Sequence, residues 1–440
     1  MKVLMAVVKR TRVVQVVITA VLSFSGISVA SAAAVTVNVN KQLNPSNTIL
    51  RGDLFRGNQN RDARIDLLAQ NGFKAACFHL ELNVENQLFS KSGGTITHKQ
   101  HAVFNSNRKR AVSKGMTVFA QATGTPHVFK PDPKYTWHGG ANYYPLPKPG
   151  EFNQLANVVS AWMNKGNTVA KSVWLGTQEP IHTIGFEGGT KTEAGKKKNL
   201  QRYADIWSRI AKKLNGKSGA MQLNGMNNDN QPYPVLAADA LNSHNTPMNY
   251  WSVQNYIAER NSSVIAGAKE ALKHCNAGKI MFNRYGYNKP WADSKKFDRS
   301  EGIVTLLQAE DAILKNSDKV TGYCLMHEGF SKYNMVQKVG KFLNEMPPNR
   351  RDASSNNNNI QVFATSNNSK LRIAVWNKGS ASQNVNITIK GKTWNNSTLK
   401  IHRGTAGTFG TINGTYNPSN GKISGFSLNG KAFALIRLGS

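Results

Sequence analysis

The sequence predicts an α/β fold, a (β/α)8 TIM barrel with a C-terminal all-β sandwich domain. Three observations support it. The chain has 440 residues, which suits a barrel of about 250 residues with a smaller module attached. Apolar strand-like segments alternate with helix-like segments through most of it. Beyond Pro347-Pro348, short alternating strands separated by Gly and Asn take over, which is typical of a small sandwich.

These changes of pattern divide the chain into five segments. Residues 1–32 are a predicted signal peptide. The strand in 33–47 has no place in the barrel and is expected to join the sandwich. The barrel is assigned to 48–348, a polar, Asn-rich linker to 349–359, and the β-sandwich to 360–440.

Each barrel unit is predicted as one strand followed by one helix. The predicted strands are 48–57, 73–82, 116–122, 172–178, 220–225, 249–255, 279–285 and 319–326. The predicted helices are 61–71, 102–114, 152–164, 198–213, 233–242, 261–274, 301–315 and 333–345. In the sandwich, strands are predicted at 360–365, 371–376, 385–389, 399–401 and 433–438.

The N-terminus has the three parts of an export signal. Basic residues open the chain, residues 13–29 are mostly apolar, and Ala30-Ser31-Ala32 has the small-x-small form of a cleavage site. We expect cleavage near Ala32 and a secreted or periplasmic protein. The alternative is an uncleaved anchor, but the apolar run is short for a membrane span. No later segment is apolar enough to cross a bilayer, so we expect no membrane span in the mature chain. We also expect the protein to be a monomer.

The cysteines indicate buried side chains rather than a disulfide framework or a metal site. There are three, so an exported chain could form at most one bridge. Cys77 and Cys324 lie in apolar strand-like runs, which favours small buried hydrophobes. Their spacing suggests no metal ligands, and we expect neither a metal nor an organic cofactor.

The charge favours an anionic partner. Lys and Arg number 56 against 24 Asp and Glu, a formal net charge of +32, and the basic residues are spread along the chain. Such a field attracts anionic polymers. Export and the lack of a nucleic-acid-binding motif argue against nucleic acid, so an acidic polysaccharide is the preferred partner. The alternative is a general adaptation of charge for solubility.

Polar and aromatic residues follow nearly every predicted barrel strand, where barrel enzymes place their catalytic groups. The candidate substrate-binding residues at these ends are Asn58, His79, Gln178, Tyr256, Arg284, Tyr285 and His327. Trp137 belongs to an aromatic cluster in a Pro/Gly-rich insertion after the third strand, where aromatic rings could stack on sugars. The alternative is that this loop packs its aromatics as a small core of its own.

The candidate general acid is Glu179. The apolar strand 172–178 runs directly into this carboxylate, which lies between Gln178 and Pro180. Such a position is rigid and lies at the mouth of the predicted barrel, beside an amide that can bind a sugar hydroxyl. The alternative is an ordinary surface glutamate before a proline.

Three short motifs carry a resemblance to a known group. Thr177-Gln178-Glu179-Pro180 resembles the Asn-Glu-Pro motif of clan-A retaining glycoside hydrolases, and Gly124-Thr125-Pro126 resembles their Thr-Pro turn. Val253-Gln254-Asn255-Tyr256 is similar to their strand-six segment, which ends in His-x-Tyr. The barrel, the sandwich and the added N-terminal strand are similar to the β-xylosidase, heparanase and agarase/porphyranase members. The resemblance implies that Glu179 is the acid/base and that Gln178 binds the sugar 2-hydroxyl.

The departure from this pattern lies at the seventh strand. The family has a nucleophilic Glu there, in Thr-Glu-Tyr-Gly, whereas this chain has Asn283-Arg284-Tyr285-Gly286. A guanidinium cannot attack an anomeric carbon, but it can hold a sulfate or carboxylate through two hydrogen bonds.

Three explanations stay open. In the first, the nucleophile has moved, with Glu328 on the eighth strand as first candidate, Glu81 and Glu259 as weaker ones, and the phenol of Tyr285 as a remote one. Strands four and eight face each other across a barrel, a separation that suits inversion through a water. Alternatively the chain binds glycans without cleaving them, or strand seven is aligned differently. Glu328 could equally support the pocket through a salt bridge.

The sequence therefore predicts a secreted glycoside hydrolase acting on an anionic polysaccharide. A sulfated galactan of the agar, porphyran or carrageenan kind ranks first, and a uronate-containing glycan second. The main alternative is a catalytically impaired barrel that binds acidic polysaccharide. A third class, a basic surface or nucleic-acid-coating protein, would show a flat basic face and no cleft.

Overall fold

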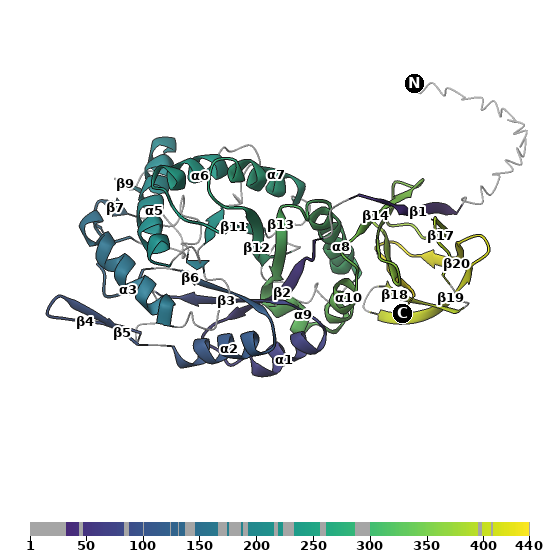
Figure 1. The fold of residues 1–440 in the computed structure, drawn as a ribbon, viewed down its shortest axis with the longest axis horizontal. Coiled ribbons are helices and arrows are strands. Elements are labelled where there is room, and N and C mark those ends of the chain that lie inside the picture. Colours follow the sequence, from purple (N-terminus) through teal and green to yellow (C-terminus); the bar gives the residue numbers. More distant parts are fainter. Residues whose placement is uncertain are drawn as a thin grey trace, which may run out of the picture. The chain divides into compact units, whose positions relative to one another are not determined.

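The protein combines a helix-covered parallel sheet with an all-β domain (Figure 1). Residues 32–440 form one compact unit. The computed structural model describes residues 32–43, 47–82, 88–99, 101–123, 125–130, 132–136, 146–165, 174–175, 186–187, 192–214, 219–222, 233–255, 261–286, 300–394, 398–405 and 408–439. Among these residues, no helix combines the length and the apolar character needed to cross a membrane.

Eight parallel strands form the larger sheet. In chain order they are β2 (Leu50–Arg56), β3 (Ala75–Glu81), β6 (Thr117–Thr123), β8 (Trp174–Leu175), β10 (Gly219–Gln222), β11 (Tyr250–Asn255), β12 (Lys279–Tyr285) and β13 (Val320–Leu325). They pair in the order β10-β11-β12-β13-β2-β3-β6-β8, and the sheet curls until β8 and β10 approach each other. No backbone pairing joins these two strands in the described residues, so the observed element is a curled parallel sheet and closure into a full barrel is not established.

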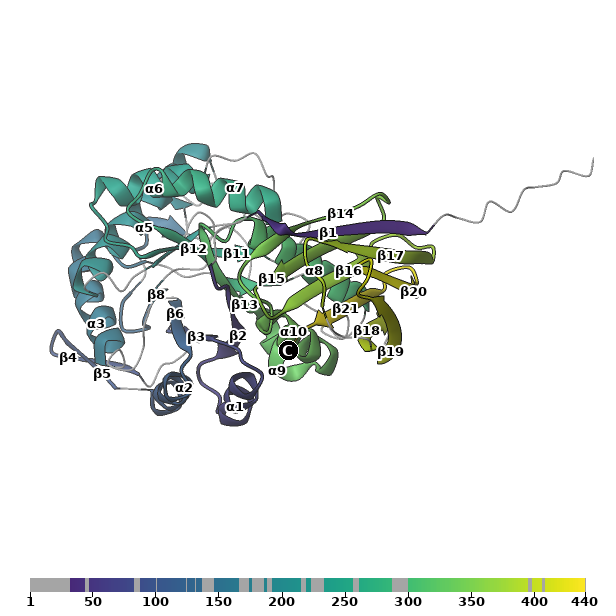
Figure 2. The ribbon, with the colours of Figure 1, turned by 45° about the vertical axis from the view of Figure 1, so that its right-hand side comes forward.

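Helices cover the outer face of this sheet (Figures 1 and 2). They are α1 (Asp62–Gln70), α2 (Ala102–Ser113), α3 (Phe152–Lys165), α5 (Glu193–Lys213), α6 (Tyr233–Ser243), α7 (Asn261–Leu272), α8 (Ser300–Lys315), α9 (Gly329–Lys332) and α10 (Asn334–Asn344). Local signals fix some of their ends. The Thr192 hydroxyl accepts a hydrogen bond from the Gly195 amide and so caps α5. Helix α10 buries Val336, Val339 and Leu343, the spacing of an apolar stripe.

Two small antiparallel pairs project from the sheet and were not predicted. Strands β4 (Phe89–Ser92) and β5 (Thr95–His98) join through Gly93-Gly94, whose φ angles are 53° and 84°. A two-residue hairpin turn with positive φ at both positions favours glycine strongly. Strand β7 (Tyr135–Thr136) pairs with β9 (Phe186–Glu187) and is the described part of the aromatic insertion.

The C-terminal domain is a closed ring of nine strands, where two stacked sheets of a sandwich were expected. The strands are β1 (Ala33–Gln42), β14 (Arg350–Ser355), β15 (Ile360–Ser366), β16 (Leu371–Asn377), β17 (Gln383–Lys390), β18 (Thr398–Thr405), β19 (Thr408–Asn417), β20 (Lys422–Leu428) and β21 (Phe433–Leu438). The predicted linker at 349–359 is wrong, because β14 lies within it. Its polar sequence is held as a strand by pairing with β1.

Strand β1 closes the ring. It pairs antiparallel with β14 and parallel with β17. Its even alternation suits a half-buried strand, since Ala33, Val35, Val37 and Val39 are buried while the residues between them are more exposed. The segment before the first barrel strand therefore contributes to the core of the domain at the other end of the chain.

The inner face of the parallel sheet carries a separate small core. It consists of Ala75, Cys77, Phe119, Met281 and Cys324. Both cysteines are buried free thiols, and burial raises the pKa of Cys324 well above its ordinary value. These side chains show which strand positions face inward. Because side chains alternate between the two faces, the residue two positions later in each strand also faces inward, and it lies at the carboxyl edge of the sheet.

A buried ionic network fastens the outer face of the sheet to α8. The Arg51 guanidinium bonds to both Glu310 carboxylate oxygens, and Tyr323 donates to Oε2 of Glu310 at 2.8 Å. The Arg51 and Glu310 side chains are 6% and 0% exposed. Removing one partner of such a pair leaves a buried charge without compensation.

We expect Glu310→Gln to destabilise the protein by about 3–5 kcal/mol, because Arg51 then loses its counter-ion inside the protein. The matched control is Tyr323→Phe, which removes a single hydrogen bond and should cost about 1 kcal/mol. Urea unfolding followed by circular dichroism measures both. Equal losses in the two variants would show that the charge pair adds nothing beyond a hydrogen bond.

Candidate functional site

The carboxyl ends of the parallel strands bring polar side chains to one edge of the sheet. Arg56 pairs in register with His79, and His79 with Gln121. Leu54, Cys77 and Phe119 each lie two residues earlier in the inner core. The pleat therefore turns Arg56, His79 and Gln121 to the same inner face, in a row across three strands. Arg56 is exposed, His79 half-buried and Gln121 fully buried.

Four predicted site residues lie outside the described residues. They are Trp137, Gln178, Glu179 and Tyr256. The strand before Glu179 is described: β8 runs parallel to β6, with Trp174 opposite Gln121. The polypeptide thus leaves β8 four residues before Glu179, at the polar edge of the sheet. Asn58, also predicted to bind substrate, is exposed in the turn after β2.

Strand β12 contains a bulge that changes which way its last residues face. The register shifts between Val253 and Gln254 of β11 and between Phe282 and Tyr285 of β12, so that Arg284 stands opposite Gln254. Asn283, at the irregularity, is fully buried, and its side-chain oxygen and nitrogen have no hydrogen-bond partner among the described residues. Buried amides of this kind are uncommon and often mark functional positions.

The assignment of Tyr285 to the substrate-binding residues is corrected by this geometry. Its side chain is fully buried, and its ring packs 5.6 Å from Phe282 and 5.4 Å from Tyr323, measured between ring centroids. Both neighbours belong to the core beneath the helices. Strict alternation from Met281 would have turned Tyr285 inward, and the bulge reverses this.

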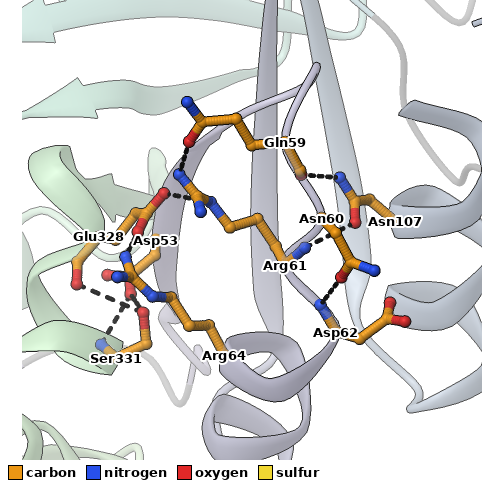
Figure 3. Close-up of polar contacts among 9 residues, drawn as sticks. All are labelled: Asp53, Gln59, Asn60, Arg61, Asp62, Arg64, Asn107, Glu328 and Ser331. Carbon is orange, nitrogen blue, oxygen red and sulfur yellow. Dashed lines mark hydrogen bonds and ion pairs between the residues drawn. The ribbon is translucent and has the colours of Figure 1, made fainter. Parts of the chain in front are cut away.

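Glu328 lies at the end of β13 in a strained turn. His327 and Glu328 have φ angles of 57° and 56°, in the left-handed region that side chains other than glycine seldom adopt. Each such residue costs about 1 kcal/mol or more and persists only where its surroundings hold it. Here the Glu328 carboxylate, 8% exposed, is ion-paired with both Arg61 and Arg64 (Figure 3).

The two arginines hold different oxygens of Glu328. Nε of Arg61 lies 2.6 Å from Oε1, and a terminal nitrogen of Arg64 contacts Oε2. Arg61 is itself fixed by Asn107, whose Oδ1 accepts from the Arg61 amide at 3.1 Å. To act as a nucleophile or base, Glu328 would have to release one guanidinium. The geometry therefore favours the supporting role that sequence analysis had left equal with catalysis.

Asp53 is a second buried carboxylate beneath the same turn, and sequence analysis did not identify it. It accepts hydrogen bonds from the amides of Phe330 and Ser331 at 2.9 and 2.8 Å and from the Ser331 hydroxyl at 2.7 Å (Figure 3). Burial raises the pKa of Asp53 to about 7, against these hydrogen bonds and nearby Arg64, which lower it. The available signal was an aspartate at the centre of a strand, directly before the apolar pair Leu54 and Phe55.

The turn also gathers positive charge. Burial lowers the pKa of His327, and the nearby cations Lys332 and Arg56 lower it further. Arg56 likewise lowers the pKa of Arg61, after burial. No described residue forms an ion pair or hydrogen bond with the Arg56 side chain, which is exposed at the inner edge. Arg56 is thus the group here with the most freedom to bind an external anion.

In the part of the chain that the structure describes, no group of three His, Cys, Asp or Glu side chains could hold a metal ion. Among the described residues, the edge offers the imidazole of His79 as a hydrogen-bonding group and the guanidinium of Arg56 as a cation.

Asp53 should make stability depend on pH. Its pKa of about 7 in the folded protein exceeds the ordinary value of 3.8, so folding favours the protonated form. The stabilisation is fully present below about pH 4 and is lost as pH rises through 7, by up to about 4 kcal/mol. Asp53→Asn cannot ionise and should lack this loss. Urea unfolding of both proteins from pH 4 to pH 8 tests this, and parallel profiles would contradict it.

The fold agrees with that of solved glycoside hydrolases. No protein-family model matches the sequence, and no curated protein matches it either. A GH30 endoxylanase from Clostridium papyrosolvens C71 superimposes with a TM-score of 0.61 at 14% identity, covering 92% of this chain and 100% of the other. A GH39 β-xylosidase from Caulobacter crescentus gives 0.63 at 11% identity, with the same coverages.

A third similar structure is a GH44 endoglucanase from a Clostridium, with a TM-score of 0.59 and 10% identity, covering 93% of this chain and 99% of the other. At such identities the likeness concerns the fold. It spans both the parallel sheet and the C-terminal domain, because almost the whole of each chain is aligned. The chain therefore has the fold of these glycoside hydrolases, in agreement with the fold expected from the sequence.

Proposed function

We propose that the protein is an exported glycoside hydrolase that cleaves O-glycosidic bonds in an anionic polysaccharide. The observation that carries this proposal is the row of Arg56, His79 and Gln121 along the carboxyl edge of the sheet. In barrels of this architecture that edge holds the active site. The similar solved structures are a xylanase, a xylosidase and a glucanase, which supports a polysaccharide or its fragments as substrate.

The proposed chemistry uses Glu179 as general acid. Protonation of the leaving glycosidic oxygen accompanies cleavage, while a second carboxylate attacks the anomeric carbon or activates a water. His79 and Gln178 would orient the sugar, with Tyr256 and Trp137 beside it. Glu328 remains a candidate for the second carboxylate, and Glu81 and Glu259 are alternatives. Its pairing with Arg61 and Arg64 supports instead a role in holding the turn after β13.

An acidic substrate is favoured by charge. The chain carries a formal net charge of +32, and Arg56 is exposed at the edge without a carboxylate partner in the described residues. Arg284 follows on β12, opposite Gln254. Guanidinium groups bind sulfate and carboxylate through paired hydrogen bonds. A sulfated galactan remains the first choice and a uronate-containing glycan the second, whereas the similar structures point to neutral xylan or glucan.

The second candidate function is binding without hydrolysis. Its specific support is the arginine at position 284, where the related enzymes have a nucleophilic glutamate, together with the two ion pairs that occupy Glu328.

Hydrolysis is tested by incubating the purified protein with sulfated, uronate-containing and neutral polysaccharides and measuring new reducing ends. Glu179→Gln should lower the rate by about 10²- to 10⁴-fold, because the leaving oxygen then lacks its proton donor.

Glu328→Gln should lower stability by about 3–5 kcal/mol, since Arg61 and Arg64 lose a buried partner. A loss of rate in Glu328→Gln as large as in Glu179→Gln, in protein that remains folded, would identify Glu328 as catalytic. No reducing ends from any polymer would favour the binding function.

The preference for an anionic substrate is tested with Arg56→Ala. The Michaelis constant for a sulfated substrate should rise about tenfold or more, because a charge-assisted hydrogen bond is lost, while that for the desulfated polymer should not change. Lys109→Ala, which removes an exposed cation from α2, is the matched control. Equal effects on both polymers would contradict a role for Arg56 in anion recognition.

A further inference from the structure

A pocket lies between the helices of the parallel sheet and the C-terminal domain. Its volume is about 900 Å³, within the range of ligand-binding pockets. Helices α7 and α8 form one side, and strands β14 and β15 with their connecting turn form the other. Figures 1 and 2 both show α8 beside the C-terminal domain. Two ion pairs fasten this junction, Arg350 to Asp311 at 2.8 Å and Arg437 to Glu345 at 2.7 Å.

This pocket is separate from the carboxyl edge of the sheet. Helices that follow parallel strands run back along them, so the C-terminal parts of α7 and α8 lie at the opposite edge. Contacts agree with this: Lys279, the first residue of β12, bonds through Nζ to the carbonyl of Asp318, which follows α8. The pocket lining includes Lys269, Lys315 and Asn316 from this region. It therefore lies away from Arg56 and Glu328.

The lining is polar and rich in neutral hydrogen-bonding groups. Asn316, Asn358 and Gln361 contribute amides, and Ser262 and Ser354 contribute hydroxyls. No aromatic ring is among the described residues that line it. The pocket is thus suited to a polar, hydroxylated ligand bound through hydrogen bonds, and not to one held by stacking.

The lining also carries uncompensated positive charge. It holds Lys269, Lys315 and Lys378 against Asp311. The carboxylate is already engaged, because Lys315 lies 2.6 Å from one of its oxygens and Arg350 contacts the other. Among the described residues, Lys269 bonds only to the neutral amide of Asn316, at 2.9 Å. No described residue pairs with the Lys378 ammonium. These two lysines can therefore meet an external anion.

We propose that this pocket is a second binding site for an anionic stretch of polysaccharide, distinct from the site of cleavage. The amides and hydroxyls bind the sugar hydroxyl groups, while Lys269 and Lys378 bind sulfate or carboxylate substituents. The choice of ligand rests on the proposed function, but the pocket itself does not. Because both domains contribute to the lining, a bound chain would also join them.

The test uses isothermal titration calorimetry on full-length protein carrying Glu179→Gln, so that the probe is not cleaved. The probes are a sulfated galactan oligosaccharide and its desulfated counterpart. The test protein also carries Lys269→Gln and Lys378→Gln, which remove both charges but keep polar side chains, so that residue 269 can still bond to Asn316. The matched control adds Lys390→Gln and Lys422→Gln, which remove two exposed lysines of the C-terminal domain outside the pocket.

Affinity for the sulfated probe should fall about tenfold or more in the pocket variant and less than about twofold in the control, with no difference for the desulfated probe. Equal affinities in the two variants would overturn the proposal. So would tighter, lysine-dependent binding of a DNA duplex, which would assign the pocket to nucleic acid. If the probe binds through these lysines but the unmodified protein cleaves no polysaccharide, the proposed hydrolase activity is rejected and the binding site is kept. If the unmodified protein cleaves polysaccharide but the lysines do not affect binding, the proposed binding site is rejected and the activity is kept. Thermal unfolding at an unchanged temperature confirms that the variants are folded.

Discussion

The in-register pairing of β2, β3 and β6 is the constraint on which the candidate site depends. Side chains in a strand alternate between faces, so one register fixes every inward position of three strands at once. Leu54, Cys77 and Phe119 fill the interior, and the next inward layer is Arg56, His79 and Gln121. The apolar layer below supports the polar layer above it. A shift of one residue in any strand would exchange its polar end residue for an apolar one.

Electrostatics fixes the neighbouring part of the edge. The strained turn at His327 and Glu328 is held from one side by Arg61 and Arg64 and from beneath by Asp53. Ion pairs and hydrogen bonds here offset the cost of two left-handed residues. The arrangement leaves Arg56 exposed among cations, which raises the local attraction for anions. The arrangement of charged side chains, more than any single carboxyl group, distinguishes this edge of the sheet.

Much of the fold could be predicted because hydrophobic periodicity is strong in parallel strands and their helices. Each predicted barrel strand and helix overlaps an observed one. Hydrophobic periodicity does not predict a strand whose sequence is polar and which is stabilised by backbone pairing with another strand. The polar segment Arg350–Ser355 is a strand because β1 binds it, and β19 and β20 are rich in Gly, Asn, Ser and Thr and show little alternation. Closure of the ring depends on which strands pair with each other. The alternation of apolar residues within one strand does not indicate its partners.

The site was predicted less completely than the fold. Strand ends could be located from sequence, and His79 and Glu328 do lie at the ends of their strands. The direction of the Tyr285 side chain could not be predicted, because one irregular residue in β12 reverses the facing of the side chains that follow it. Asp53 was missed because its partners are backbone amides of residues 330 and 331, far away in the chain. The ion pairs of Glu328 join residues more than 260 positions apart, a separation at which local pattern carries no information.

Strand β1 also has a consequence for biosynthesis. It leaves the ribosome before any part of the parallel sheet, yet its partners β14 and β17 begin only at residues 350 and 383. Domains generally fold in the order in which they are synthesised. The pairing of β1 with β14 and β17 therefore cannot form until those later residues have been synthesised. The C-terminal domain is thus completed only when strand β1 and the strands beyond residue 350 are both present.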